Sequence, residues 1–202
     1  MKVYLLPFLF VLFACQNKIE KQTGINENIK KNSFNHISLE KDYEEILLAI
    51  LTYDSSYHEL MKTNKPQAFI NNQFIKISID TLNDELPPSP NGVTINELLT
   101  VIGNTALDSI GYFNQTNNLN TVFVPKEIAT VYKVLDGNKL KMPEYYFSRY
   151  DFHIPILSHN GKKAFVSLDY NCGPLCGGGS NFILNKIKDK WIVVKRNATW
   201  IS

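Results

Sequence analysis

The chain has 202 residues and a mass of 23.1 kDa, which suits one domain with short appendages rather than two full domains. Apolar residues make up 44 % of the chain and aromatic residues 12 %, which is sufficient for a buried core. The formal net charge is only +2 and the basic residues are scattered, whereas nucleic-acid binding usually requires a concentrated basic face. We therefore expect no nucleic-acid partner.

The N-terminus has the layout of an export signal. A basic start, Met1-Lys2, precedes the apolar residues 3–14, and the sequence after Cys15 is polar. The apolar run is shorter than the roughly 20 residues that a membrane-spanning helix needs. We therefore predict that residues 1–14 are a signal peptide and that the chain is exported.

The junction at the end of this signal resembles the bacterial lipobox. Leu12 stands three residues before Cys15 and Ala14 stands directly before it, although Phe13 replaces the usual small residue. In a lipobox the cysteine becomes the lipidated first residue of the mature chain, so we predict a lipid anchor on Cys15 that holds the protein to the cell envelope. The alternative is an ordinary signal peptide followed by an incidental cysteine. Because Gln16 is not Asp, the outer membrane is favoured in a gram-negative cell.

The segment after this junction is a polar spacer. Residues 15–33 comprise the lipidated cysteine and a lysine- and asparagine-rich stretch without apolar periodicity. We interpret the stretch as a flexible tether with a root-mean-square reach of roughly 25 Å. The remaining residues, 34–202, are predicted to form a single α+β domain.

Three segments of this domain have helical signals, at residues 39–62, 94–110 and 127–135. In the first segment, apolar residues recur at steps of three and four, and Ser38 is available as the N-cap. The second segment opens with Thr94 and Glu97, which have the spacing of a capping box. The third follows Pro125, a residue typical of a helix start.

Strand-like alternation marks five segments, at residues 69–81, 145–153, 163–171, 181–187 and 191–200. The last four are joined by short connections with turn residues, such as Asn160-Gly161 and Asp189-Lys190, and short connections favour antiparallel neighbours. We therefore predict an α+β fold in which N-terminal helices pack on a mainly antiparallel sheet, whose C-terminal part is a four-strand meander. Because apolar residues occupy both faces of 181–187, the sheet is expected to be covered on both sides or strongly curved.

The two remaining cysteines lie in the glycine-rich stretch between two predicted strands. If Cys15 carries lipid, Cys172 and Cys176 are the one pair left in an oxidising compartment, which favours a structural disulfide. The alternative is redox activity, because Cys-Gly-Pro-Leu-Cys resembles the thioredoxin motif with Leu175 inserted. That motif opens a helix, which lowers the thiol pKa, whereas a strand-like segment follows here. A metal would need two further ligands, so we expect neither a metal nor a cofactor.

A second group of polar residues follows one face of the predicted sheet. Arg149, Asp151 and His153 alternate along residues 145–153, and Asp169 on the next strand is expected diagonal to Arg149. A carboxylate, a histidine and an arginine together are able to do acid–base chemistry or to bind a ligand. The alternative is a structural ion pair. We treat the four as candidate ligand-site residues and assign no catalytic residue.

The two tryptophans, Trp191 and Trp200, are expected to pack in the core or against the sheet. An exposed Trp200 would instead indicate a binding platform, for example for a carbohydrate.

Several short motifs follow one another in order near the C-terminus. They are Ser148-Arg149 with Phe152, Ala164 with Val166, Cys172 to Gly179, Lys190-Trp191 with Val193, and Trp200-Ile201-Ser202. Together they resemble a C-terminal pattern of an uncharacterised group of bacterial exported proteins and lipoproteins. The resemblance covers the last 55 residues and implies export, but it implies no activity.

We therefore predict a membrane-anchored envelope lipoprotein that acts as a binding or interaction module, with an envelope protein or a small molecule as its partner. The alternative is an envelope enzyme. It would be a thiol-disulfide oxidoreductase using Cys172 and Cys176, or a small hydrolase using Arg149, His153 and Asp169.

Overall fold

The computed structural model describes residues 36–53, 68–80, 92–103, 105–117, 120–140, 148–173 and 175–202. The predicted signal peptide, the lipid anchor on Cys15 and the tether all lie outside these residues. The described residues belong to one compact unit, Asn35–Ser202. None of the described helices is long and apolar enough to cross a membrane.

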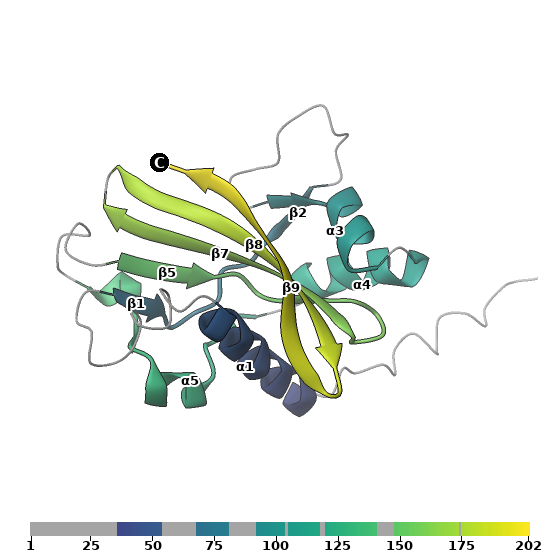
Figure 1. Ribbon diagram of the computed structural model, residues 1–202, viewed down its shortest axis with the longest axis horizontal. Coiled ribbons are helices and arrows are strands. Elements are labelled where there is room, and N and C mark those ends of the chain that lie inside the picture. Colours follow the sequence, from purple (N-terminus) through teal and green to yellow (C-terminus); the bar gives the residue numbers. More distant parts are fainter. Residues whose placement is uncertain are drawn as a thin grey trace, which may run out of the picture. The chain divides into compact units, whose positions relative to one another are not determined.

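In these residues, four α-helices pack on a mixed, mostly antiparallel seven-strand sheet (Figure 1). The helices are α1 (His36–Tyr53), α3 (Ile95–Val101), α4 (Ala106–Asn117) and α5 (Lys126–Val131), and a 3-10 turn, η2, spans Gly137–Lys139. The sheet strands are β1 (Ala68–Asn71), β4 (Val134–Leu135), β5 (Ser148–Phe152), β6 (Ile156–Leu157), β7 (Lys163–Gly173), β8 (Cys176–Ile187) and β9 (Lys190–Ile201). Strands β2 (Ser78–Asp80) and β3 (Gly92–Thr94) form a separate parallel pair.

The strand order is β4-β1-β5-β7-β8-β9, with β6 also paired to β7. Strands β5, β7, β8 and β9 are successive antiparallel neighbours, which confirms the predicted order of the C-terminal strands. The parallel pairing of β1 with β4 and β5 was not predicted. The regular strand pairing is interrupted between β5 and β6. There Ile154 N donates to Ile75 O at 2.9 Å, and Pro155 has no N–H to donate.

The sheet has a buried core on each face, as the alternation predicted. The first face, defined by Ala164, Val166 and Leu168 on β7, packs against α1 and α5. The second face, which begins with Phe165 and Ile183, packs against α3, α4 and the β2-β3 pair. Figure 1 shows α1 beside β9, with α3, α4 and β2 grouped apart from it.

Strand β8 begins at Cys176, five residues before the predicted start at 181. Glycine-rich sequence was interpreted as part of a connection, but Gly177, Gly178 and Gly179 are paired with β7 throughout. The β8-β9 turn has Lys188 and Asp189 at φ 48° and 60°, the left-handed backbone typical of a two-residue hairpin.

Several predicted helix and strand ends were wrong. Helix α1 begins at His36, so Ser38 is not its N-cap, and its predicted end at 62 lies outside the described residues. The predicted strand 69–81 is divided into β1 and β2. The predicted helix 127–135 ends at Val131, and its last two residues instead form strand β4.

The predicted helix 94–110 is two helices. Its start is confirmed, since Glu97 N donates to Thr94 Oγ1 at 3.1 Å. The helix is interrupted after Ile102, because Thr105 and Asp108 cap a new helix. Asp108 N donates to Thr105 Oγ1 at 3.1 Å. The Asp108 carboxylate lies so close to Gly103 that a Cβ there would be 2.6 Å from it. A glycine is therefore needed at the break.

Candidate functional site

The four candidate ligand-site residues lie on the second face of the sheet. In the β5-β7 register Asp151 is opposite Asp169 and Arg149 is opposite Asn171, so Asp169 is diagonal to Arg149. Their side chains nevertheless form two separate clusters, one around each carboxylate.

The first cluster surrounds Asp151, whose buried carboxylate accepts two hydrogen bonds. Arg149 Nε donates to Oδ2 at 2.8 Å and Asn71 Nδ2 donates to Oδ1 at 2.9 Å. Gly137 of η2 lies close above them, since a Cβ there would be 3.3 Å from Arg149 Cδ. The cluster therefore joins β1, β5 and η2, and Asn71 is a member that sequence analysis missed because its strand was not predicted beside β5.

The second cluster is a chain of three side chains centred on Asp169. His153 Nε2 is 2.8 Å from Asp169 Oδ2, and Trp200 Nε1 donates to Asp169 Oδ1 at 2.9 Å. Because a carboxylate accepts, Nε2 carries the hydrogen in this pair. His153 is only 1 % exposed, and its Nδ1 has no hydrogen-bond partner among the described residues. A general base must reach its substrate, and this nitrogen is enclosed by protein.

Trp200 is held flat against glycine backbone. A Cβ on Gly179 would be 2.3 Å from Trp200 Nε1, and a Cβ on Gly177 would be 3.0 Å from the far edge of the same ring. Gly178 points to the first face, where a Cβ would be 2.6 Å from the ring of Tyr170. The three glycines therefore make room for one aromatic ring on each face of β8, a reason for glycine that no turn motif predicts.

Trp191 lies in the core and Trp200 packs against the sheet, both as predicted, but Trp200 remains partly exposed. Trp191 is buried, and its Nε1 donates to Asp42 Oδ1 of α1 at 2.9 Å. Trp200 is 39 % exposed even though its Nε1 is bound to Asp169. The difference arises because α1 covers the tip of the β8-β9 hairpin on the first face, whereas Trp200 lies on the second face at the other end of β9.

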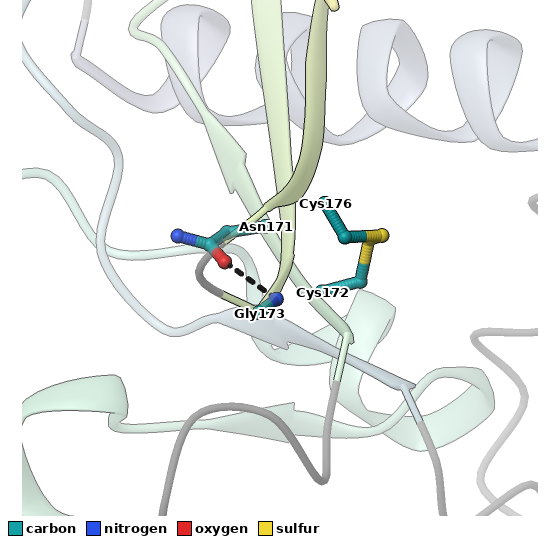
Figure 2. The surroundings of a disulfide bond; sticks show 4 residues. All are labelled: Asn171, Cys172, Gly173 and Cys176. Carbon is teal, nitrogen blue, oxygen red and sulfur yellow. Dashed lines mark hydrogen bonds between the residues drawn. A yellow bond between two sulfur atoms is a disulfide. The ribbon is translucent and has the colours of Figure 1, made fainter. Parts of the chain in front are cut away.

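The disulfide between Cys172 and Cys176 is present, as predicted, with the two Cα atoms 5.0 Å apart (Figure 2). It closes the end of the β7-β8 hairpin, where Gly173 has a φ of +136° and donates its N–H to Asn171 Oδ1 at 3.0 Å. In Figure 2 the two sulfur atoms point away from the Asn171 side chain. Leu175, within the loop that the disulfide closes, is 90 % exposed.

Asp108 is a buried carboxylate that sequence analysis did not single out. It accepts hydrogen bonds from Thr105 and, at 2.7 Å through Oδ1, from the backbone N–H of His159. Burial raises the pKa of Asp108, but the hydrogen bonds from the Thr105 side chain and from the backbone of His159 and Thr105 outweigh it, so the pKa is lowered. Thr-x-x-Asp, a variant of the capping box, was the signal available in the sequence. Asp108 ties α4 to the turn after β6 and is not part of either candidate cluster.

These side chains are arranged for holding strands together rather than for chemistry. Both oxygens of Asp151 and of Asp169 are bound to protein donors. Among the described residues, no group of three His, Cys, Asp or Glu side chains lies close enough together to hold a metal ion. Trp200, Arg149 and Asp169 are partly exposed side chains of the two clusters.

Comparisons with protein-family models, with curated proteins and with solved structures found no match for this chain.

Proposed function

We propose that the protein is a lipid-anchored envelope lipoprotein that binds a protein partner and has no catalytic role. Its contact surface is the disulfide end, which we define as Cys172, Leu175, Cys176, Trp200 and Ile201. The observation that carries the proposal is the exposure of Trp200, a large aromatic side chain fixed in place at the end of a hairpin. Leu175 and Ile201, which are 90 % and 81 % exposed, accompany it at the same end.

The rigidity of the disulfide end supports its role as a contact surface. Trp200 is positioned by its hydrogen bond to Asp169 and by the glycines of β8, and the disulfide fixes the neighbouring turn. A side chain that is already ordered loses little conformational entropy when a partner binds. Tryptophan is also among the residues that most often supply the binding energy of an interface.

The polar groups around Trp200 favour an apolar protein surface over a sugar as the partner. Trp200 Nε1 and both carboxylate oxygens of Asp169 are already engaged within the chain. A bound sugar would need free donors and acceptors beside the ring to satisfy its hydroxyl groups. An apolar side chain from a partner has no such need.

The enzyme alternatives have less support. A hydrolase would require His153 to reach a substrate, and this side chain is buried with Asp169 occupying Nε2. An oxidoreductase would require a reactive thiol at a helix N-terminus, and Cys172 and Cys176 lie on two paired strands.

Photocrosslinking in intact cells tests the contact surface. We would replace Leu175 in the full chain with photoreactive p-benzoylphenylalanine and, as a matched control, Phe123, which is exposed on a different segment. We expect one discrete adduct from position 175 and none from position 123. In the Leu175-labelled chain, Trp200→Ala should lower the adduct yield about tenfold or more, as truncation of a central interface tryptophan usually does.

Two outcomes would contradict the proposal. Equal adducts from positions 175 and 123 would show that the disulfide end is not selective. A double variant, Cys172→Ser with Cys176→Ser, should keep the adduct and lose only stability. If it instead folds but abolishes the biological effect of the protein while the adduct persists, the cysteines act chemically and the oxidoreductase takes precedence.

A further inference from the structure

The turn between β8 and β9 carries an exposed surface of alternating basic and apolar residues. This turn-end patch comprises Lys163, Ile187, Lys188, Lys190, Ile192 and Lys195, all of them exposed. In the β8-β9 register Ile187 is opposite Lys190 and Asn185 is opposite Ile192, so the two isoleucines are diagonal neighbours on the second face. They are 47 % and 46 % exposed, so each presents about half of its surface to solvent.

The patch is a local concentration of positive charge. Between Lys186 and Arg196 the chain has five basic residues and one acidic residue, a local charge of +4 in a chain whose total is +2. The four lysines of the patch form no ion pair with any residue that the structure describes. Their charge is therefore available to an external anionic partner.

The β8-β9 hairpin that carries the patch is bound to the first half of α1. Asp42 Oδ1 accepts from Lys186 Nζ at 2.6 Å and from Trp191 Nε1 at 2.9 Å, and the Lys186 ammonium lies 5.4 Å from the Trp191 ring centroid. Helix α1 begins at His36. Asp42 lies six residues farther along, which corresponds to about 9 Å along the helix axis.

Helix α1 is oriented with this start toward the patch. The other end of α1, at Tyr53, packs against Phe182 farther along β8, with ring centroids 6.4 Å apart. Figure 1 shows the first turns of α1 near the β8-β9 turn. The chain that leads to the predicted anchor on Cys15 therefore joins the domain at the end that carries the patch.

We propose that the turn-end patch docks on an anionic phospholipid surface, with the lysines on the headgroup phosphates and Ile187 and Ile192 in the interfacial layer. Each lysine near an anionic surface strengthens binding about fivefold, and apolar side chains between the lysines add burial in the interface. The inference rests on the proposed lipid anchor, because the tether predicted from the sequence, with a reach of roughly 25 Å, would keep the patch at high effective concentration beside the membrane. It does not depend on the partner bound at the disulfide end.

Docking of this patch orients the molecule. Leu175 and Ile187 are twelve residues apart, with strand β8 between them, so the disulfide end lies roughly 40 Å from the patch along the strand. A membrane-bound patch would therefore present Trp200 and Leu175 away from the lipid, where an envelope partner reaches them.

Depth-dependent quenching tests the contact in the full chain reconstituted into vesicles. Ile187→Trp places a reporter in the patch, and Leu175→Trp places a matched reporter at the other end of β8. We expect brominated lipid to quench the Ile187→Trp signal in vesicles of phosphatidylcholine with phosphatidylglycerol, and much less in phosphatidylcholine alone. The Leu175→Trp signal should not respond in either. Adding Lys188→Glu and Lys190→Glu to the Ile187→Trp chain should lower the affinity of the patch for anionic vesicles by about 30-fold or more and remove the quenching.

Flotation of the same vesicles separates the patch from the anchor. In neutral vesicles the anchor alone should carry the protein upward. A chain that floats with the anionic vesicles but shows no quenching at position 187 in them overturns docking and leaves the anchor in place. A chain that floats with neither kind of vesicle overturns both. Equal quenching at positions 187 and 175 also overturns docking. Photocrosslinking from p-benzoylphenylalanine at position 187 gives one further outcome. If it captures an acidic protein, and brominated lipid does not quench the Ile187→Trp signal, the patch binds protein instead of lipid, which overturns the proposal as well.

Discussion

The two faces of the sheet are built differently, although they alternate residue by residue along the same strands. The first face is apolar from Leu184 to Tyr170, and α1 and α5 pack against it. The apolar core cluster of the second face lies around Phe165 and Ile183, under α3 and α4. Beyond them it carries the two carboxylate clusters and then the half-exposed ring of Trp200.

This difference separates the residues that drive folding from those available for recognition. Burial of apolar area is the main stabilising contribution, so the continuous first face supplies most of the stability. The second face can present polar and aromatic groups because little of the core depends on its far end. Variants on the two faces should therefore differ in their effect on stability and in their effect on the exposed aromatic ring.

The largest effect is expected from the first face. Phe182 is fully buried and packs edge-on against Tyr53 of α1. Phe182→Ala should lower the free energy of unfolding by about 3–5 kcal/mol, because it removes apolar contacts and leaves a cavity. Urea denaturation measures the loss. Phe123→Ala, at an exposed phenylalanine, should change the free energy by less than about 1 kcal/mol, and similar losses in both variants would contradict the distinction between core and surface.

The first face is also the part of the fold that the sequence predicts best. Alternation along β7 and β9 and the helical spacing of α1 all follow from burial of one side, so they are visible in the residues themselves. The parallel pairing of β1 with β5 was not visible, because it depends on contacts far apart in the chain. For the same reason Asn71 could not be placed beside Asp151.

The candidate site was harder to predict, because each of its residue types is compatible with more than one structural role. The sequence indicated a row of charged residues on one face, but not which donor each carboxylate accepts from. The sequence predicts a turn at the glycines of β8, but glycine permits turns and close packing alike. Only the position of the Trp200 ring distinguishes the two uses. Exposure of Trp200 likewise depends on which part of the second face α3 and α4 cover, which local sequence does not determine.

An intermediate effect is expected at Asp108, which holds α4 over the second face. Its pKa is lowered in the folded state, so its stabilising contribution is complete above the unfolded pKa, about 4, and is lost as pH falls through the folded value. Asp108→Asn should lower the free energy of unfolding by about 1.5–3 kcal/mol at neutral pH, because the amide cannot accept all of the hydrogen bonds.

Urea denaturation of both chains between neutral pH and pH 3 checks this expectation. The difference between wild type and Asp108→Asn should shrink as the solution becomes acidic. Glu40→Gln, at an exposed carboxylate of α1, should change the free energy by less than about 0.5 kcal/mol at any of these pH values. A difference for Asp108→Asn that stays constant down to pH 3 would show that the charge of Asp108 does not contribute.

The smallest effect on stability, and the most specific one, is expected at Gly179. An added Cβ would be 2.3 Å from Trp200 Nε1 and 2.4 Å from Thr199 Oγ1, so Gly179→Ala must displace the Trp200 ring. The free energy of unfolding should fall by about 1–2 kcal/mol, as for other overpacked sites. Because Trp191 is buried, acrylamide quenching reports mainly on Trp200 and should increase. Gly111→Ala, in α4, adds a Cβ that meets nothing closer than Gln115 Nε2 at 4.0 Å, so it should instead stabilise the protein by about 0.5–1 kcal/mol and leave the quenching unchanged. If Gly179→Ala leaves both stability and quenching at the wild-type values, the glycines of β8 do not position the ring, and the disulfide end loses the rigidity on which its proposed role depends.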